Sequence, residues 1–171
     1  MARLRKFVAY RRIERPYTRF SRYREKSYVR SRPPCRVVRF NLGDPKRTYQ
    51  CTLHLVSKVD LQVRDNAIES ARKSMIHLLE KNLGKTGYEM QIRMYPHHVL
   101  RENPLASGAG ADRMSTGMAH SFGKPIGRAA RIKKGQAIIT VKFDKAQMDL
   151  AKQSLKRASY KLPCKTAIVL G

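Results

Sequence analysis

Excess positive charge restricts what this chain can fold into more than any other feature of its sequence. Its 171 residues include 37 lysines and arginines against 12 aspartates and glutamates, a formal net charge of +25 at neutral pH. A compact domain with this charge repels itself, so we expect its working state to include a polyanion that neutralises it. Nucleic acid is the polyanion that fits best.

An anionic membrane surface is the competing partner for so basic a chain. No stretch approaches the roughly 18 consecutive apolar residues of a spanning helix, and the basic segments lack the apolar face of a membrane-surface helix. The start of the chain has no apolar signal segment, because Phe7, Val8 and Ala9 are followed at once by Tyr10 and Arg11. The sequence therefore predicts a cytosolic protein that binds no membrane.

Residues 1–34 form a basic arm whose aromatic side chains are spaced without the period of a helix or a strand. We expect this arm to become ordered when its guanidinium groups pair with phosphates and its rings stack on RNA bases. A solvated basic tail is the alternative, but such a tail has no need of so many aromatic residues. The predicted RNA-binding residues of this region are Arg3, Arg5, Lys6, Arg11, Arg12, Arg15, Arg19, Arg22, Arg24, Arg30, Arg32 and Arg36.

Residues 35–171 have the pattern of one folded domain. Alternating apolar residues predict strands, with a turn at 41–45 after the first and with His54 on the polar, surface side of the second. The predicted strands cover residues 37–40, 49–59, 88–95, 126–132, 136–143 and 166–170.

Two stretches of this domain have apolar residues at helical spacing, one from Asn66 to Leu83 and one between Asp144 and Pro163. Each begins with a predicted capping box, Asn66 with Glu69 and Asp144 with Gln147. Strands and helices do not alternate regularly. We therefore predict an α+β fold in which two main helices pack on one side of a mostly antiparallel sheet.

The sequence predicts no catalytic residue, no metal and no cofactor. Cys35, Cys51 and Cys164 are far apart and form no Cys-x-x-Cys pair, so neither a disulfide framework nor a zinc site is indicated. The adjacent His97 and His98 point to opposite sides of an extended chain and have no acidic or thiol neighbour in sequence. No nucleophile elbow or catalytic carboxylate pair is visible.

A segment rich in glycine, alanine and serine, residues 103–124, interrupts the domain, and a connection this long is usually functional. It lacks the third glycine of a dinucleotide fingerprint, and its Gly117 and Gly123 do not have the spacing of a P-loop. The remaining interpretation is a loop whose backbone approaches RNA closely. The basic residues expected to accompany it are Arg113, His120, Lys124, Arg128, Arg131, Lys133 and Lys134.

The motifs in and around this loop are specific. Residues 108–118 read Gly-Ala-Gly-Ala-Asp-Arg-Met-Ser-Thr-Gly-Met, residues 121–127 read Ser-Phe-Gly-Lys-Pro-Ile-Gly, and residues 130–136 read Ala-Arg-Ile-Lys-Lys-Gly-Gln. With Arg-Pro-Tyr-Thr-Arg at 15–19, they closely resemble the universal large-subunit ribosomal protein sixteen family, in its archaeal and eukaryotic ten-e branch. The likeness spans nearly the whole chain, and the absence of an extension after Gly171 leads us to expect an archaeal member.

This resemblance implies a structural constituent of the large ribosomal subunit and not an enzyme. The protein would bind large-subunit rRNA at the base of the central protuberance, near 5S rRNA, neighbouring ribosomal proteins and assembly factors. Its loop would point toward the peptidyl transferase centre and the acceptor ends of tRNA, helping to position tRNA and to complete subunit maturation. Arg113 matches the loop arginine of the family, and the loop residues implied to face that centre are Ser107, Gly108, Gly110, Asp112, Arg113 and Met114.

Two other classes of protein remain as alternatives. A basic architectural protein that binds duplex DNA without sequence preference would share the charge but has no need of the loop. An RNA-modifying enzyme would need a cofactor pocket or a tuned pair of acid and base residues, for which the sequence has no signal.

Overall fold

The computed structural model describes residues 5–13, 23, 25, 33–102 and 124–171. Within them a five-stranded antiparallel sheet has the strand order β1-β4-β7-β2-β8. The strands are β1 (Asn41–Gly43), β2 (Cys51–Ser57), β4 (Glu89–Ile92), β7 (Ala137–Phe143) and β8 (Thr166–Leu170).

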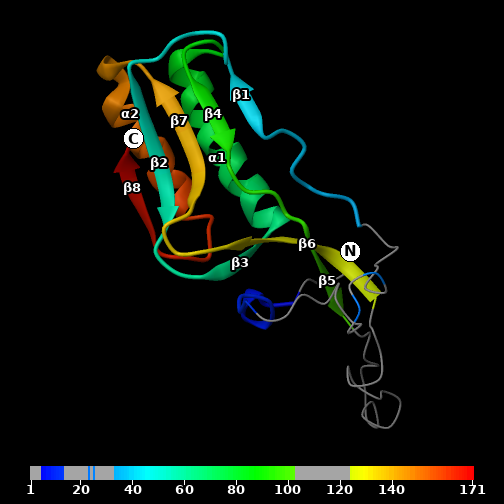
Figure 1. Ribbon diagram of the computed structural model, residues 1–171. Coiled ribbons are helices and arrows are strands. Elements are labelled where there is room, and N and C mark those ends of the chain that lie inside the picture. The colour runs from blue at the N-terminus through cyan, green and yellow to red at the C-terminus, as the bar shows by residue number, and fades with distance from the viewer. Residues whose placement is uncertain (1–4, 14–22, 24, 26–32, 103–123) are drawn as a thin grey trace, which may run out of the picture.

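Two helices, α1 (Asp65–Leu83) and α2 (Met148–Ser159), pack together on one face of this sheet (Figure 1). The predicted α+β fold is confirmed. The predicted apolar stripe of α1 is buried up to Leu79, with Leu83 half-buried, and α2 buries Ala151, Leu155 and Ala158 of its predicted stripe. These side chains meet the alternate apolar residues of β2, β4 and β7 in the main hydrophobic core.

A second sheet has three strands in the order β3-β6-β5. They are β3 (Leu61–Arg64), β5 (His98–Glu102) and β6 (Lys124–Ile132), and both pairings are antiparallel. At one end Leu61, Val63 and Ile132 belong to the main core, and from there the sheet extends to one side of the five-stranded sheet (Figure 1). The sequence predicted only β6 of these strands.

The predicted strand over 37–40 is wrong, because these residues form no strand and β1 follows them where a turn was predicted. Gly43 explains the difference. Its φ is +87°, and a Cβ atom there would lie 1.9 Å from the carbonyl oxygen of Tyr88. Only glycine permits this approach, which lets the short strand pair with β4 and then turn.

Both predicted capping boxes are wrong. Helix α1 begins one residue earlier than expected, and Glu69 binds Arg72 instead of turning back to the helix start. Asp65 accepts hydrogen bonds from the backbone N–H groups of Asn66 and Arg36, at 2.8 and 3.1 Å. In the second helical region a 3-10 turn (Lys145–Gln147) precedes α2, whose start has no side-chain cap.

Residues 5–13 of the predicted arm, including a 3-10 turn (Phe7–Ala9), lie against the second sheet. Tyr10, a ring expected to stack on RNA, is instead 6% exposed and packs with Leu100 and Ala129. The side-chain amide of Gln62 donates hydrogen bonds to the carbonyls of Tyr10 and Arg12, at 3.1 and 2.7 Å. The backbone N–H of Gln62 donates to the carbonyl between them, that of residue 11, at 3.0 Å.

His98 completes this set of contacts. Its Nδ1 lies 2.5 Å from the Oε1 atom of Gln62. Burial, and then the charge of Arg131, lower the pKa of His98 to about 4, so its ring is neutral at neutral pH. Because a carbonyl oxygen can only accept, Nδ1 carries the hydrogen and donates it to Gln62.

The low pKa of His98 predicts a loss of stability in mild acid. Between pH 6.5 and 4 the unfolded chain binds a proton at this residue while the folded chain does not. Stability therefore falls as the pH falls through this window, by about 1 kcal/mol between pH 7 and pH 5.5. Chemical denaturation at the two pH values measures the loss.

His98→Asn keeps a hydrogen-bond donor and removes the titration, so this part of the pH dependence should disappear in the variant. His77→Asn, at an exposed position of α1, is the matched control and should behave as the wild type does. Equal pH dependence in all three proteins would contradict the assignment.

Candidate nucleic-acid interface

The predicted RNA-binding residues fall into two groups. Ten lie in the part of the chain that the structure describes, namely Arg5, Lys6, Arg11, Arg12, Arg36, Lys124, Arg128, Arg131, Lys133 and Lys134. Outside the described residues are Arg3, Arg15, Arg19, Arg22, Arg24, Arg30, Arg32, Arg113 and His120, with the loop residues Ser107, Gly108, Gly110, Asp112 and Met114.

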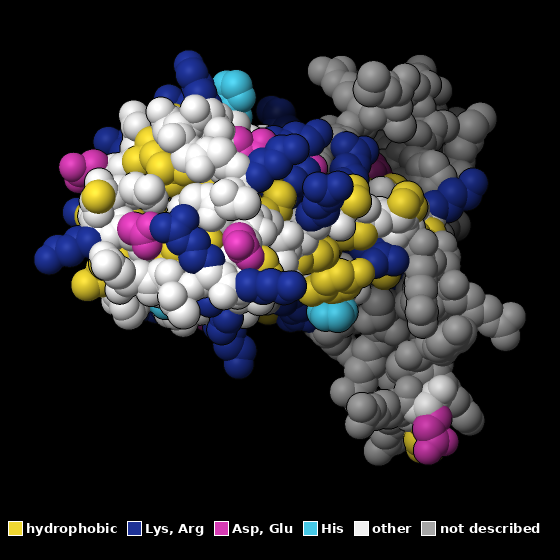
Figure 2. Space-filling view, turned by 90° about the horizontal axis from the view of Figure 1, so that it is seen from above, with side chains coloured by type: hydrophobic (Ala, Val, Ile, Leu, Met, Phe, Trp, Pro, Cys, Tyr) yellow, Lys and Arg dark blue, Asp and Glu magenta, His cyan; other side chains and the backbone are white. Residues whose placement is uncertain are grey.

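The second sheet brings basic residues from distant parts of the sequence together. Arg131 is opposite Gln62, and Arg128 is opposite Val99. Cross-strand partners share a face of the sheet and successive residues alternate. Arg131 is therefore on the face that residues 5–13 cover, whereas Arg128 is on the other face. Figure 2 shows that Lys and Arg dominate the charged side chains seen from above.

Arg64, at the end of β3, is a further basic residue of the second sheet, although the sequence did not predict a role for it. Its guanidinium lies 5.9 Å from the ring centroids of both Phe7 and Tyr10, within the range of a cation–π contact. It also donates a hydrogen bond to the carbonyl of Arg5, at 3.1 Å. Arg64 and residues 5–13 thus hold each other in place. This role of Arg64 arises only when segments far apart in the sequence pair in the fold.

The base of the predicted loop is fixed by the second sheet. Glu102, the last residue of β5, is paired with Lys124, the first of β6. Glu102 also forms an ion pair with Arg5 and accepts a hydrogen bond from the hydroxyl of Tyr10, at 3.3 Å. Burial, and then the charge of Glu102, raise the pKa of Tyr10, so its hydroxyl keeps its proton and donates. The N-terminal segment therefore contacts the point where the loop leaves the domain.

A cavity of about 120 Å³ lies between β5, β6 and the start of α1. Arg36, Arg64 and Arg128 line it, together with Asp65 and Asn66. One water occupies about 30 Å³ of liquid, so this space can hold a group the size of a phosphate. Arginine and a helix N-terminus are both suited to binding anions, and this cavity combines them.

Lys133 and Lys134 lie apart from the basic residues at the base of the loop. They lie in the turn from β6 to β7, where the backbone N–H of Lys134 donates to Asp60, at 2.5 Å. The eight steps from Lys124 to Ile132 span roughly 27 Å at about 3.4 Å per residue. The two lysines therefore form a separate basic point at the other end of the strand.

In the part of the chain that the structure describes, no group of three or more His, Cys, Asp and Glu residues is placed to hold a metal ion. His54 is half-buried with its Nδ1 2.9 Å from the Thr140 hydroxyl, and His97 is exposed beside the Tyr95 ring. Neither described helix has the length and apolar character needed to cross a membrane.

Comparison with known proteins identifies the family. The model of the family described as ribosomal protein L16p/L10e matches residues 15–169. The large ribosomal subunit protein uL16 of Methanococcus aeolicus is 46% identical over 98% of this chain and 94% of its own length. Its counterpart from Archaeoglobus fulgidus is 42% identical over 94% of this chain and 89% of its own length. That of Nanoarchaeum equitans is 46% identical over 84% of this chain and 80% of its own length.

These matches confirm the family that the loop motifs predicted, including its archaeal branch. They also set aside the two alternatives, a DNA-binding architectural protein and an RNA-modifying enzyme. The chain belongs to the ribosomal protein L16p/L10e family, and it is a structural component of the ribosome and not an enzyme.

Proposed function

We propose that this chain is a constituent of the large subunit of the cytoplasmic ribosome and binds large-subunit rRNA at the base of the central protuberance, near 5S rRNA. Its loop, residues 103–124, extends toward the peptidyl transferase centre and the acceptor ends of tRNA, where it helps to position tRNA and to complete subunit maturation. Neighbouring ribosomal proteins and assembly factors are its protein partners. The relatives named as large-subunit proteins support the first part of this proposal.

The observation that carries the proposal is the meeting of basic residues at the base of the loop. Arg5 comes from the N-terminal segment, Arg64 from β3, and Lys124 and Arg128 from β6. Phosphate pairing supplies most of the affinity of such a surface, while contacts to bases supply specificity. The N-terminal arm and the stem of the loop would thus bind the same region of folded rRNA.

Within this proposal the loop has a different task from the sheet. Its ends are held side by side by the pairing of Glu102 with Lys124. A fixed stem directs the loop into the RNA. Arg113, six positions into the glycine-bearing stretch 108–118, is the residue that we assign nearest the functional centre. Ser107, Gly108, Gly110, Asp112 and Met114 would line the same tip.

Sedimentation through a high-salt gradient tests the assignment to the large subunit. The tagged full-length chain should migrate with large subunits, and replacing Arg64 and Arg128 together by Gln should shift protein into the unbound fractions. The same change should flatten the plot of log affinity for large-subunit rRNA against log salt, by roughly 1.4 to 1.8 for two lost phosphate contacts.

The matched control replaces Lys152 and Arg157, two exposed residues of α2, by Gln, and it should sediment as the wild type does. If wild-type protein pellets with DNA instead of ribosomes, or binds rRNA with an affinity insensitive to salt, the proposed function is wrong.

Deleting residues 105–118 tests the division of labour between loop and domain. We expect a loop of this composition to contribute little to the core, so the variant should unfold within a few degrees of the wild-type melting temperature. Large subunits that contain it should be defective in late maturation or in translation. A much lower melting temperature, or fully active subunits, would refute a functional loop on an independent domain.

A further inference from the structure

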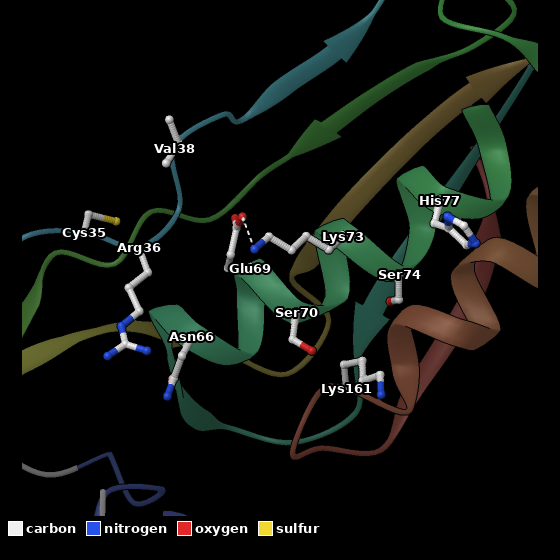
Figure 3. A pocket seen from close by; sticks show the side chains of 10 residues that line it. All are labelled: Cys35, Arg36, Val38, Asn66, Glu69, Ser70, Lys73, Ser74, His77 and Lys161. Carbon is white, nitrogen blue, oxygen red and sulfur yellow. Dashed lines mark ion pairs between the residues drawn. The ribbon is translucent and has the colours of Figure 1, made fainter. Parts of the chain in front are cut away.

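A groove of about 830 Å³ runs along α1 (Figure 3). Three parts of the chain contribute to it: the segment from Cys35 to Val38, the outer face of α1, and Lys161 after α2. The lining follows the helix from Asn66 to His77, which is 11 steps or roughly 16 Å at 1.5 Å per residue. It is therefore long enough for several successive groups of a linear polymer.

Positive charge is in excess in this groove. Arg36, Lys73 and Lys161 line it, and Glu69 is the one acidic residue among the lining groups. Glu69 is already compensated, because Arg72 binds both of its carboxylate oxygens, with Nε donating at 2.8 Å. The hydrogen bond from Arg72 lowers the pKa of Glu69 and so keeps the pair charged.

Lys73 is available to a ligand despite its position beside Glu69. Its Nζ lies 3.9 Å from the Oε1 atom of Glu69, which is a weak ion pair, and its side chain is 71% exposed. The dashed line in Figure 3 marks this contact. Exposed pairs of this kind contribute little stability, so a phosphate oxygen can readily take the place of the carboxylate.

Small polar groups line the same side of the helix. Asn66, Ser70 and Ser74 follow one another at intervals of four residues, so they lie on one face. Ser74 donates its hydroxyl hydrogen to the carbonyl of Ala71, at 2.9 Å, which leaves its oxygen to accept. The Oδ1 atom of Asn66 is buried and has no hydrogen-bond partner among the described residues. The Ser74 oxygen can accept a hydrogen bond from the 2′-hydroxyl of RNA, which donates as well as accepts.

The groove also continues the candidate interface. Arg36 and Asn66 line both the groove and the smaller cavity that holds Arg64 and Arg128. In Figure 3 Arg36 lies by the first turn of α1, and Lys161 lies on the side of α2. Apolar side chains are few, with Cys35 and Val38 the examples in the lining.

We propose that this groove binds the sugar-phosphate backbone of RNA, as a continuation of the surface at the loop base. The inference rests on the proposed function and adds a second RNA-binding surface to the protein. An RNA strand leaving the arginine cavity runs along α1, with phosphates on Lys73 and Lys161 and ribose hydroxyls on the Asn and Ser side chains. Phosphate pairing supplies most of the affinity of this surface, as it does in other proteins that bind nucleic acid.

Binding of the full-length chain to protein-free large-subunit rRNA, transcribed in vitro, tests this proposal. Replacing Lys73 and Lys161 together by Gln should reduce the slope of log affinity against log salt by roughly 1.4 to 1.8. The matched control replaces Lys85 and Lys156, two exposed lysines outside the groove, and should leave the slope at the wild-type value.

The outcomes separate this inference from the function on which it rests. A wild-type slope in the groove variant, beside a reduced slope in the variant of Arg64 and Arg128, overturns the groove and leaves the function standing. An equal reduction of the slope in the groove variant and in its lysine control also overturns the groove proposal, because the effect would then come from net charge alone. Salt-insensitive binding by the wild-type chain would count against the function itself.

Photo-crosslinking identifies the occupant of the groove directly. With p-benzoylphenylalanine in place of Ser70, which is exposed within the lining, isolated large subunits should yield an adduct with rRNA on irradiation. An adduct with a ribosomal protein, or no RNA adduct, would overturn the proposal.

Discussion

The hydrogen bonds of Gln62 are the contacts on which the arrangement of the candidate interface depends. This buried residue binds the carbonyls of residues 10, 11 and 12 and receives a hydrogen bond from His98. Leaving such a buried polar group unpaired costs about 1–3 kcal/mol. The N-terminal segment is thereby fixed over the second sheet, and Arg5 reaches Glu102 at the base of the loop. These hydrogen bonds act together with the burial of Tyr10 and the contacts of Arg64 to hold an arginine-rich segment on a basic domain.

The two sheets have different physical tasks. The five-stranded sheet and its helices bury most of the apolar core, whose removal from water drives folding. The second sheet joins that core at one end only, through Leu61, Val63 and Ile132. Its remaining length carries cations and the stem of the loop. Part of the positive charge is thus placed on an extension and along the outer face of α1, where a polyanion can reach it.

The sequence predicted the elements whose apolar pattern is long and regular, namely both helices and the strands near 49–59, 88–95, 126–132, 136–143 and 166–170. It did not predict β3, because the apolar alternation over residues 49–59 gives no sign that the chain leaves the five-stranded sheet after Ser57 and enters the second sheet. It missed β5, since His98 and Arg101 are not typical of a strand. Arg128 and Arg131 were found because they follow the loop. Gln62, Arg64 and Glu102 were not, because their roles arise only when distant segments pair.

Hydrogen exchange of the backbone amides, measured on the full-length chain with Gln62→Leu beside the wild type, tests the anchoring role of Gln62 most directly. If this side chain fixes the N-terminal segment, the Tyr10 amide, which donates to Phe7 at 2.9 Å in the wild type, loses its protection in the variant. Amides of β7 and α2 keep theirs, because the main core is untouched. Unchanged protection of residues 5–13 in the variant would contradict the account.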